Sequence, residues 1–135
     1  MNALLDTNII LDVLLQRQPF HVDALKIFEL AEAKNINGFI SATAFTDIHY
    51  VLRKALGNNS AQKILKQLTD IFAILAVTET EILDALEFQW KDFEDAVQYA
   101  VAVNTQMDAI VSRNKRDYQD SAVPLYEPAE LLQKL

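Results

Sequence analysis

Residues 3–15 read ALLDTNIILDVLL, and they give the clearest indication of the fold. An apolar run at residues 3–5 is followed at once by Asp6, and a second apolar run then continues to Leu15. A short and continuously apolar run is typical of a strand that is covered on both of its faces. The stretch therefore predicts a buried strand over Ala3–Asp6, followed by a short helix over Asn8–Leu15.

The same alternation recurs along the rest of the chain. It predicts further strands at Phe39–Ala42, Phe72–Val77 and Ala109–Ser112, with a short edge strand at Val123–Tyr126. It predicts helices at His21–Lys34, Thr43–Leu56, Ser60–Asp70, Glu79–Phe88, Asp92–Gln106 and Pro128–Leu135, with Ser60 and Thr78 as N-caps. Short apolar strands between helices predict an α/β fold, with a mostly parallel central sheet of four to five strands flanked by helices.

Composition narrows the classes of protein. The chain has 135 residues, of which 51% are hydrophobic and 23% charged, so we expect one domain spanning residues 1–135. No apolar run approaches the roughly 20 residues of a membrane span. The N-terminus lacks the basic segment of a secretory signal. The absence of Cys excludes disulfides and thiolate sites, and agrees with a cytoplasmic location.

The charge balance bears on nucleic-acid binding. Twelve basic and 19 acidic residues give a net charge of −7. A protein that binds nucleic acid by general electrostatic attraction is basic. If this chain binds nucleic acid, it therefore needs a local basic patch or bound cations, although most of its acids are expected on solvated helix faces.

Two acids fall at positions where a solvated surface does not explain them easily. Asp6 lies between two apolar runs and needs a partner or an ion, or else it only caps the next helix. Asp47 lies at the edge of the apolar stripe of its helix. The alternative for Asp47 is a half-exposed acid that pairs with Arg53 or Lys54.

Two polar groups follow later in the chain. Asp92, Glu94 and Asp95 crowd the first turn of a helix, where acids also offset the helix dipole and imitate a capping box. After the fourth strand comes Ser-Arg-Asn-Lys-Arg-Asp-Tyr, which is either a solvated turn or a patch that contacts phosphate. The residues of interest in this segment are Ser112, Arg113, Asn114, Lys115, Arg116 and Asp117.

These dispersed oxygen ligands suit Mg²⁺ or Mn²⁺. Two such ions about 4 Å apart can activate a water and hold a scissile phosphate. His21 and His49 are not at ligand spacing, and the sequence holds no Gly-rich phosphate loop, nucleophile elbow or HExxH motif. The chemistry predicted from the residues is therefore carboxylate-based and metal-dependent.

With these residues identified, the sequence resembles the PIN-domain ribonucleases, of the kind found as VapC-like toxins of toxin–antitoxin pairs. The resemblance covers essentially the whole chain. It rests on four blocks, LLDTNIILDVLL, SATAFTDIHYVLRK, DFEDAVQYAVA and AIVSRNKRDY, in that order. It implies a three-layer PIN-like fold, hydrolysis of RNA, frequent homodimers and inhibition by an antitoxin.

The resemblance also implies roles for individual residues. Asp6 matches the first aspartate of the family, Asn8 follows it in the DTN signature, and Asp95 matches a later acid, with Asp92 in reserve. Asp47 stands where many members carry Glu, and Asn114 where many carry Asp, so Asp117 is expected to supply that charge. The resemblance implies metal ligands at Asp6, Asp95, Asp117 and Asn114, and catalytic residues at Asp6, Asp47, Asp95 and Asp117. It implies that these residues are supported by Asn8 and Ser112, and that RNA is contacted by Arg113, Lys115 and Arg116.

Two other functions stay open on the sequence alone. The departures at Asp47 and Asn114 are compatible with an inactive PIN-like domain that serves as a binding or assembly module. A metal-dependent phosphatase or receiver-like domain is disfavoured, because Asp6-Thr7-Asn8 lacks the second acid of a D-x-D motif.

Overall fold

The protein is described by a computed structural model that covers residues 1–118 and 120–135. Its strands are β1 (Asn2–Leu5), β2 (Asn37–Ser41), β3 (Ala73–Leu75), β4 (Ala109–Val111) and β5 (Leu125–Tyr126). They form one sheet in the order β3-β2-β1-β4-β5, and every neighbouring pair is parallel. The predicted α/β class with a parallel sheet is confirmed.

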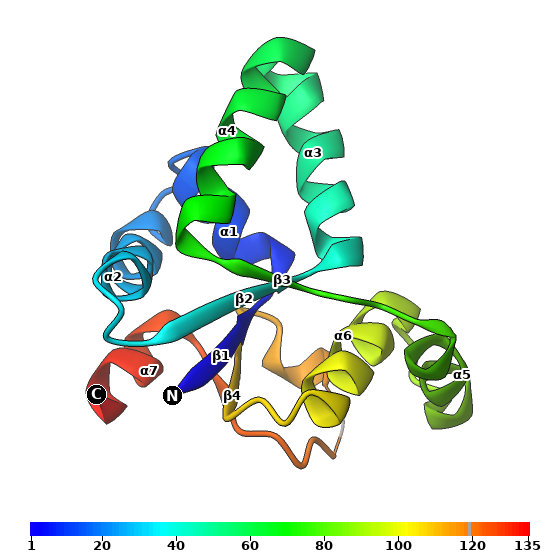
Figure 1. Ribbon diagram of the computed structural model, residues 1–135. Helices are drawn as coiled ribbons and strands as arrows, with labels where there is room; N and C mark the ends of the chain where they lie inside the picture. Colours follow the sequence, from blue (N-terminus) through cyan, green and yellow to red (C-terminus); the bar gives the residue numbers. More distant parts are fainter. Residues whose placement is uncertain (119) are drawn as a thin grey trace.

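The helices connect these strands. They are α1 (Thr7–Leu14), α2 (His21–Glu32), α3 (Ala42–Leu56), α4 (Asn58–Ile71), α5 (Glu79–Phe88), α6 (Phe93–Asn104) and α7 (Pro128–Lys134), with a 3₁₀ turn, η1, at Lys115–Asp117. Helices α1 to α4 lie on one side of the sheet, and α5 and α6 lie on the other (Figure 1). No helix in the described residues is long and apolar enough to cross a bilayer.

The central strands explain why their sequences are continuously apolar. Along β1, Leu5 packs into the core beneath α1 to α4, whereas Leu4 packs into the second core beside α6. Along β4, Val111 and Ile110 divide between the same two cores. Successive side chains of a strand point to opposite faces, so a strand that is covered twice must be apolar at every position.

Some predicted boundaries were wrong. Ser60 does not cap α4, because α4 already begins at Asn58, separated from α3 only by Gly57 with φ 87°. Strand β3 is confined to Ala73–Leu75, and Phe72 instead packs edge-on against Phe28 in the core. Pro128 does open α7, and Thr78 does cap α5 as predicted.

The one residue of β2 that must lack a side chain is Gly38. A Cβ added there would lie 2.5 Å from Cδ1 of Phe72. We expect Gly38→Ala to lower the free energy of unfolding by about 1–3 kcal/mol, because the core would be overpacked. Thermal denaturation would test this, and Gly38→Ala combined with Phe72→Leu should recover part of the loss. A melting temperature unchanged from the parent would contradict this account of the packing.

The topology fixes where a site can form. From β1 the chain first builds the sheet toward β2 and β3, and later returns to the other side of β1 with β4 and β5. Ligands of open parallel sheets bind outside the carboxyl ends of the strands, where the direction of building reverses. Here that point lies between β1 and β4, which end immediately before Asp6 and Ser112.

Candidate metal centre

Asp6 is the hub of the polar network at this edge. Its Oδ1 accepts a hydrogen bond from the backbone N–H of Thr7 at 2.7 Å, and its Oδ2 accepts one from Ser112 Oγ at 2.8 Å. The hydroxyl of Tyr118 lies 3.3 Å from the same Oδ2. Burial raises the pKa of Asp6, although these bonds oppose the rise. Asp6 therefore caps α1 and is also held in place by the segment after β4.

Ser112 connects Asp6 to the segment that follows β4. Its side chain is completely buried, and its Oγ also accepts the backbone N–H of Asn114 at 3.0 Å. Because one hydroxyl bonds both residues, the position of Asn114 is tied to that of Asp6. Asn114 itself is exposed and lines the same cavity as Asp6.

The first turn of α6 brings three further acids to the site. Asp92 is the N-cap, and its Oδ1 accepts the backbone N–H of Asp95 at 3.1 Å, so the capping role foreseen for Asp92 is present. One carboxylate oxygen from each of Asp92, Asp95 and Asp117 lies within 4.8 Å of the other two. That spacing would let one cation contact several of them.

The electrostatics show how crowded these acids are. Burial, together with the charges of Asp6, Asp92 and Asp117, raises the pKa of Asp95 to about 7. Carboxylates that are buried together resist ionisation unless a positive charge joins them. Asp6 and Asp95 are thus electrostatic neighbours although they lie 89 positions apart in the sequence.

Asp47 approaches from α3 on the facing wall. Burial raises its pKa, and the charge of Asp47 is in turn the largest cause of the raised pKa of Glu94. The alternative pairing with Arg53 or Lys54 is not found among the described residues. Both cations instead lie over the ring of Tyr50, with Lys54 Nζ 4.4 Å from its centroid. Asp47 therefore belongs to the acidic cavity.

A cavity of about 680 Å³ joins most of the predicted site residues. Its lining includes Asp6, Asn8, Asp47, Asp92, Glu94, Asp95 and Asn114. Asp117 lines a second cavity with Asp92 and Glu94, which line the first as well. Ser112 lies buried behind Asp6 and lines neither cavity.

The three basic residues after β4 are placed differently from one another. Arg113 binds the buried carboxylate of Asp12, and Lys115 pairs with Glu130, 2.8 Å away. Arg116 is exposed, and the described residues offer it no ion pair. Of the three predicted RNA contacts, Arg116 is therefore the one without an ion pair among the described residues, whereas the pair of Lys115 is open to solvent.

Sequence reasoning missed Tyr118 and Asp12, and it did not assign Glu94 to the site. Tyr118 is 3% exposed and donates to Asp6, yet in the sequence it is one more aromatic that could pack anywhere. Asp12 is fully buried, and its position within the apolar run ILDVLL was a usable signal that it has a buried partner.

The donor set fits a hard divalent cation. It consists of carboxylate and amide oxygens, which are the ligands of Mg²⁺ and Mn²⁺. Two of its acids have raised pKa values because burial and like charge are not compensated by a nearby cation. In addition, Oδ1 of Asn8 is buried without a hydrogen-bond partner among the described residues. Bound cations would relieve the repulsion among the acids.

Comparison with known proteins identifies this arrangement. The sequence model described as "PIN domain" matches residues 2–116. The chain belongs to the PIN domain family. Its PIN fold places Asp6, Asp47, Asp95 and the segment after β4 around one acidic cavity.

Relatives of this PIN domain include one curated protein and several solved structures. Ribonuclease VapC1 of Aquifex aeolicus (strain VF5) is 26% identical over 118 residues, which is 84% of this chain and 81% of that protein. VapBC-1 from nontypeable Haemophilus influenzae aligns with a TM-score of 0.73 at 15% identity, covering 96% of this chain and 99% of that chain. VapBC2 from Rickettsia felis, bound to a DNA fragment of its promoter, aligns with a TM-score of 0.72 at 17% identity, covering 94% and 98%. The two structures support the fold.

Proposed function

We propose that this PIN domain is a ribonuclease that hydrolyses RNA phosphodiester bonds with Mg²⁺ or Mn²⁺. The observation that carries the proposal is the convergence of acids on adjoining cavities of a PIN fold, from the end of β1 and from α3, α6 and η1. The name of the Aquifex aeolicus relative, a ribonuclease, supports the same activity.

The chain's own residues would divide the work. Asp6, Asp95, Asp117 and Asn114 would hold the cation, with Asp92 beside them. When bound, a divalent cation supplies a Lewis acid that polarises the phosphate and lowers the pKa of water. Ser112 and Tyr118 keep Asp6 oriented through their hydroxyls. Asp47 would orient the attacking water from the facing wall, and Arg116 would contact the RNA backbone.

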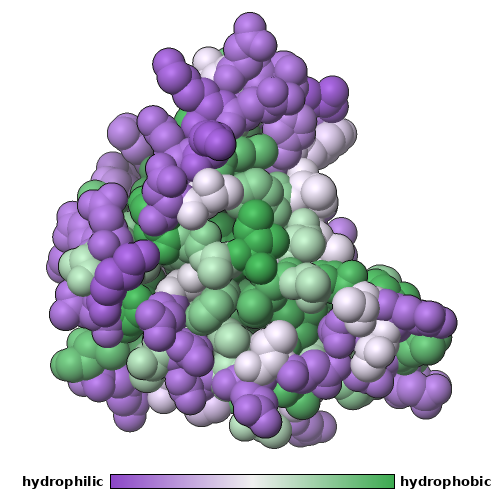
Figure 2. Space-filling model, viewed as in Figure 1, coloured by the Kyte–Doolittle hydropathy of each residue, from purple (hydrophilic) through white to green (hydrophobic). Residues whose placement is uncertain are grey.

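We further propose that the protein is the toxin of a toxin–antitoxin pair, acts in the cytoplasm and forms a homodimer. VapBC and FitAB assemblies among the solved structures support a protein partner. So does the surface, because apolar side chains gather across the middle of one face, around the edge strand β3 (Figure 2), where Ile74 is 45% exposed. An exposed apolar sheet edge is typical of a surface that a partner covers.

Metal removal tests the activity. We expect the purified protein to cut a single-stranded RNA in Mn²⁺, to lose cleavage in EDTA, and to regain it when Mn²⁺ or Mg²⁺ is added in excess. Electrophoresis of end-labelled RNA would measure this. Cleavage that persists in EDTA would contradict a metal-dependent mechanism and would point to a contaminating nuclease.

The competing function, an inactive binding module, makes a different prediction. The inactive module is suggested by the amide of Asn114, where many family members carry Asp, and by the shorter acid Asp47, where many carry Glu. In the structure Asp117 provides a carboxylate beside Asp92 and Asp95, which favours a competent cation site. Titration calorimetry separates the two, because the module predicts no saturable Mn²⁺ binding at millimolar concentration.

A further inference from the structure

A buried ion pair lies directly beside the acidic cavity. Asp12, on α1, is completely buried. Arg113 donates two hydrogen bonds to its carboxylate, from Nε to Oδ2 at 2.6 Å and from Nη2 to Oδ1 at 3.0 Å. Arg17 lies 3.7 Å from the same carboxylate. A two-point pair of this kind fixes the orientation of the guanidinium plane as well as its position.

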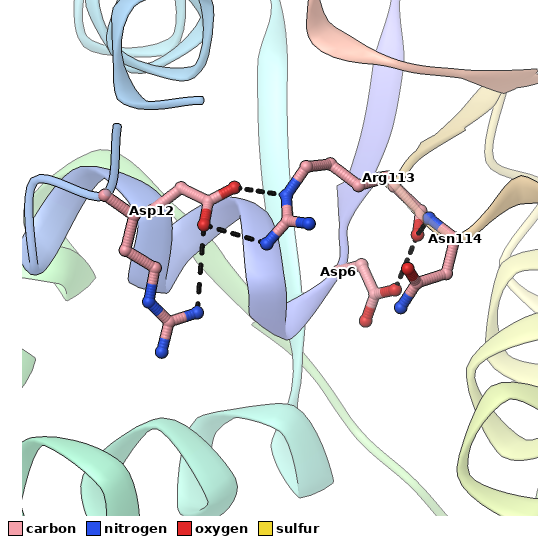
Figure 3. Close-up of polar contacts among 6 residues, drawn as sticks. Asp6, Asp12, Arg113 and Asn114 are labelled. Atoms are coloured by element: carbon pink, nitrogen blue, oxygen red, sulfur yellow. Dashed lines mark hydrogen bonds and ion pairs between the residues drawn. The ribbon is translucent and has the colours of Figure 1, made fainter. Parts of the chain in front are cut away.

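The guanidinium of Arg113 is covered on its flat face too. Its Cζ lies 4.0 Å from the ring centroid of Phe20, in the segment between α1 and α2. Figure 3 shows the side chain of Arg113 reaching toward Asp12, while Asp6 and Asn114 lie to the other side of it. To offer Nε and Nη2 to a phosphate, Arg113 would have to break both hydrogen bonds to a buried carboxylate, which would then keep only Arg17 at 3.7 Å, and removing a partner from a buried ion pair is unfavourable.

The position of Arg113 in the chain gives the pair its importance. Ser112 and Asn114 are its two neighbours in the sequence. Ser112 Oγ donates a hydrogen bond to Asp6 Oδ2 and accepts one from the backbone N–H of Asn114. Asp12 belongs to the same helix that Asp6 caps. The segment after β4 is therefore attached to α1 at two places. Ser112 bonds Asp6 at the start of the helix, and Arg113 bonds Asp12 about one and two-thirds turns later.

We propose that Asp12 and Arg113 are a positioning pair. The pair holds the Ser112–Asn114 segment against α1, so that Asp6 and Asn114 face the cavity in the geometry that a divalent cation needs. Arg113 thus acts through Ser112 and Asn114, and it does not contact RNA. The catalytic consequence rests on the proposed function, whereas the positioning itself is a property of the folded chain.

Arg113→Lys is the deciding variant, because lysine keeps the positive charge but cannot donate the two parallel hydrogen bonds to Asp12. We expect kcat for RNA cleavage to fall about 10- to 100-fold with KM nearly unchanged, and the Kd for Mn²⁺ measured by calorimetry to rise about 10-fold, as for other residues that orient metal ligands. In metal-free protein, the Asn114 amide should exchange its hydrogen at least about 10-fold faster than in the parent, because local opening becomes easier. Asp12→Asn should act in the same direction, provided that it folds.

Leu68→Ala is the matched control. Leu68 is buried in α4, lines neither cavity, and its truncation should lower the melting temperature without moving Kd for Mn²⁺, kcat or exchange at Asn114. Three results would overturn the proposal. Arg113→Lys could leave kcat, the Kd for Mn²⁺ and exchange at Asn114 unchanged, or Arg113→Lys and Leu68→Ala could shift these three quantities equally. Arg113→Lys could also raise KM alone, which is the signature of an RNA contact. If the parent cuts no RNA, the proposed function fails, and Mn²⁺ affinity and exchange at Asn114 still decide the role of the pair.

Discussion

Asp6→Asn and Asp95→Asn should each lower the rate of RNA cleavage by about a thousand-fold or more, comparable to the loss of other groups that act directly on the reacting atoms. Each variant removes a negative charge from the centre of the acidic cavity but leaves an oxygen in nearly the same place. The cation would then be held less tightly and with the wrong charge around it. Single-turnover cleavage of end-labelled RNA in saturating Mn²⁺ would measure the loss.

The matched control for both variants is Asp70→Asn. Asp70 is an exposed acid near the end of α4 and lines neither cavity, so this variant makes the same change in net charge and should cut RNA at the parental rate. Circular dichroism should show all three variants folded. If Asp6→Asn and Asp95→Asn cut RNA as fast as Asp70→Asn, the carboxylates of the cavity are not the catalytic groups.

In EDTA, the protein should be more stable near pH 5 than near pH 7.5. Asp95 has a pKa raised to about 7 in the folded protein, against 3.8 for an ordinary aspartate, so at pH 5 the folded state binds a proton that the unfolded state does not. Stability is then lost as pH rises through the folded pKa. Two pH units at about 1.4 kcal/mol each predict a loss of on the order of 2–3 kcal/mol, or several degrees in melting temperature.

The raised pKa values of Asp6 and Glu94 act in the same direction. Hydrogen bonds from Asn104 and Thr78 lower the pKa of Glu81 to about 2, so the stability that Glu81 contributes is lost only as the pH falls below about 4.5 and changes little between pH 5 and pH 7.5. Asp95→Asn should flatten the profile, and saturating Mn²⁺ should reverse it by favouring the ionised acids. A melting temperature in EDTA that rises from pH 5 to pH 7.5 would show that these acids do not share one crowded site.

The sequence predicts the site wherever backbone topology alone brings residues together. Asp6 and Ser112 follow apolar runs, and the carboxyl ends of parallel strands meet at one edge, so their convergence follows once the runs are recognised as neighbouring strands. The place of Asp95 can also be predicted from the sequence, because acids in the first turn of this helix lie at the helix end that faces the same edge of the sheet.

The remainder depends on the direction of individual side chains. Arg113 and Arg116 look equivalent in the sequence. In the structure, however, Arg113 forms an ion pair with the buried carboxylate of Asp12, whereas Arg116 is exposed. Nothing in local periodicity decides which residue of an irregular segment turns inward, because that is settled by packing against distant elements. The same limit hid the hydroxyl of Tyr118, which reaches Asp6 from 112 positions away.

That separation has a consequence during synthesis. The first aspartate of the cavity leaves the ribosome early, but the serine that fixes it lies 106 positions later, and Asp117 later still. A nascent chain therefore carries no assembled cation site until β4 has emerged and paired with β1. For an RNA-cutting toxin, the ribosome that makes it would be protected until the segment from Ser112 to Asp117 has left the exit tunnel.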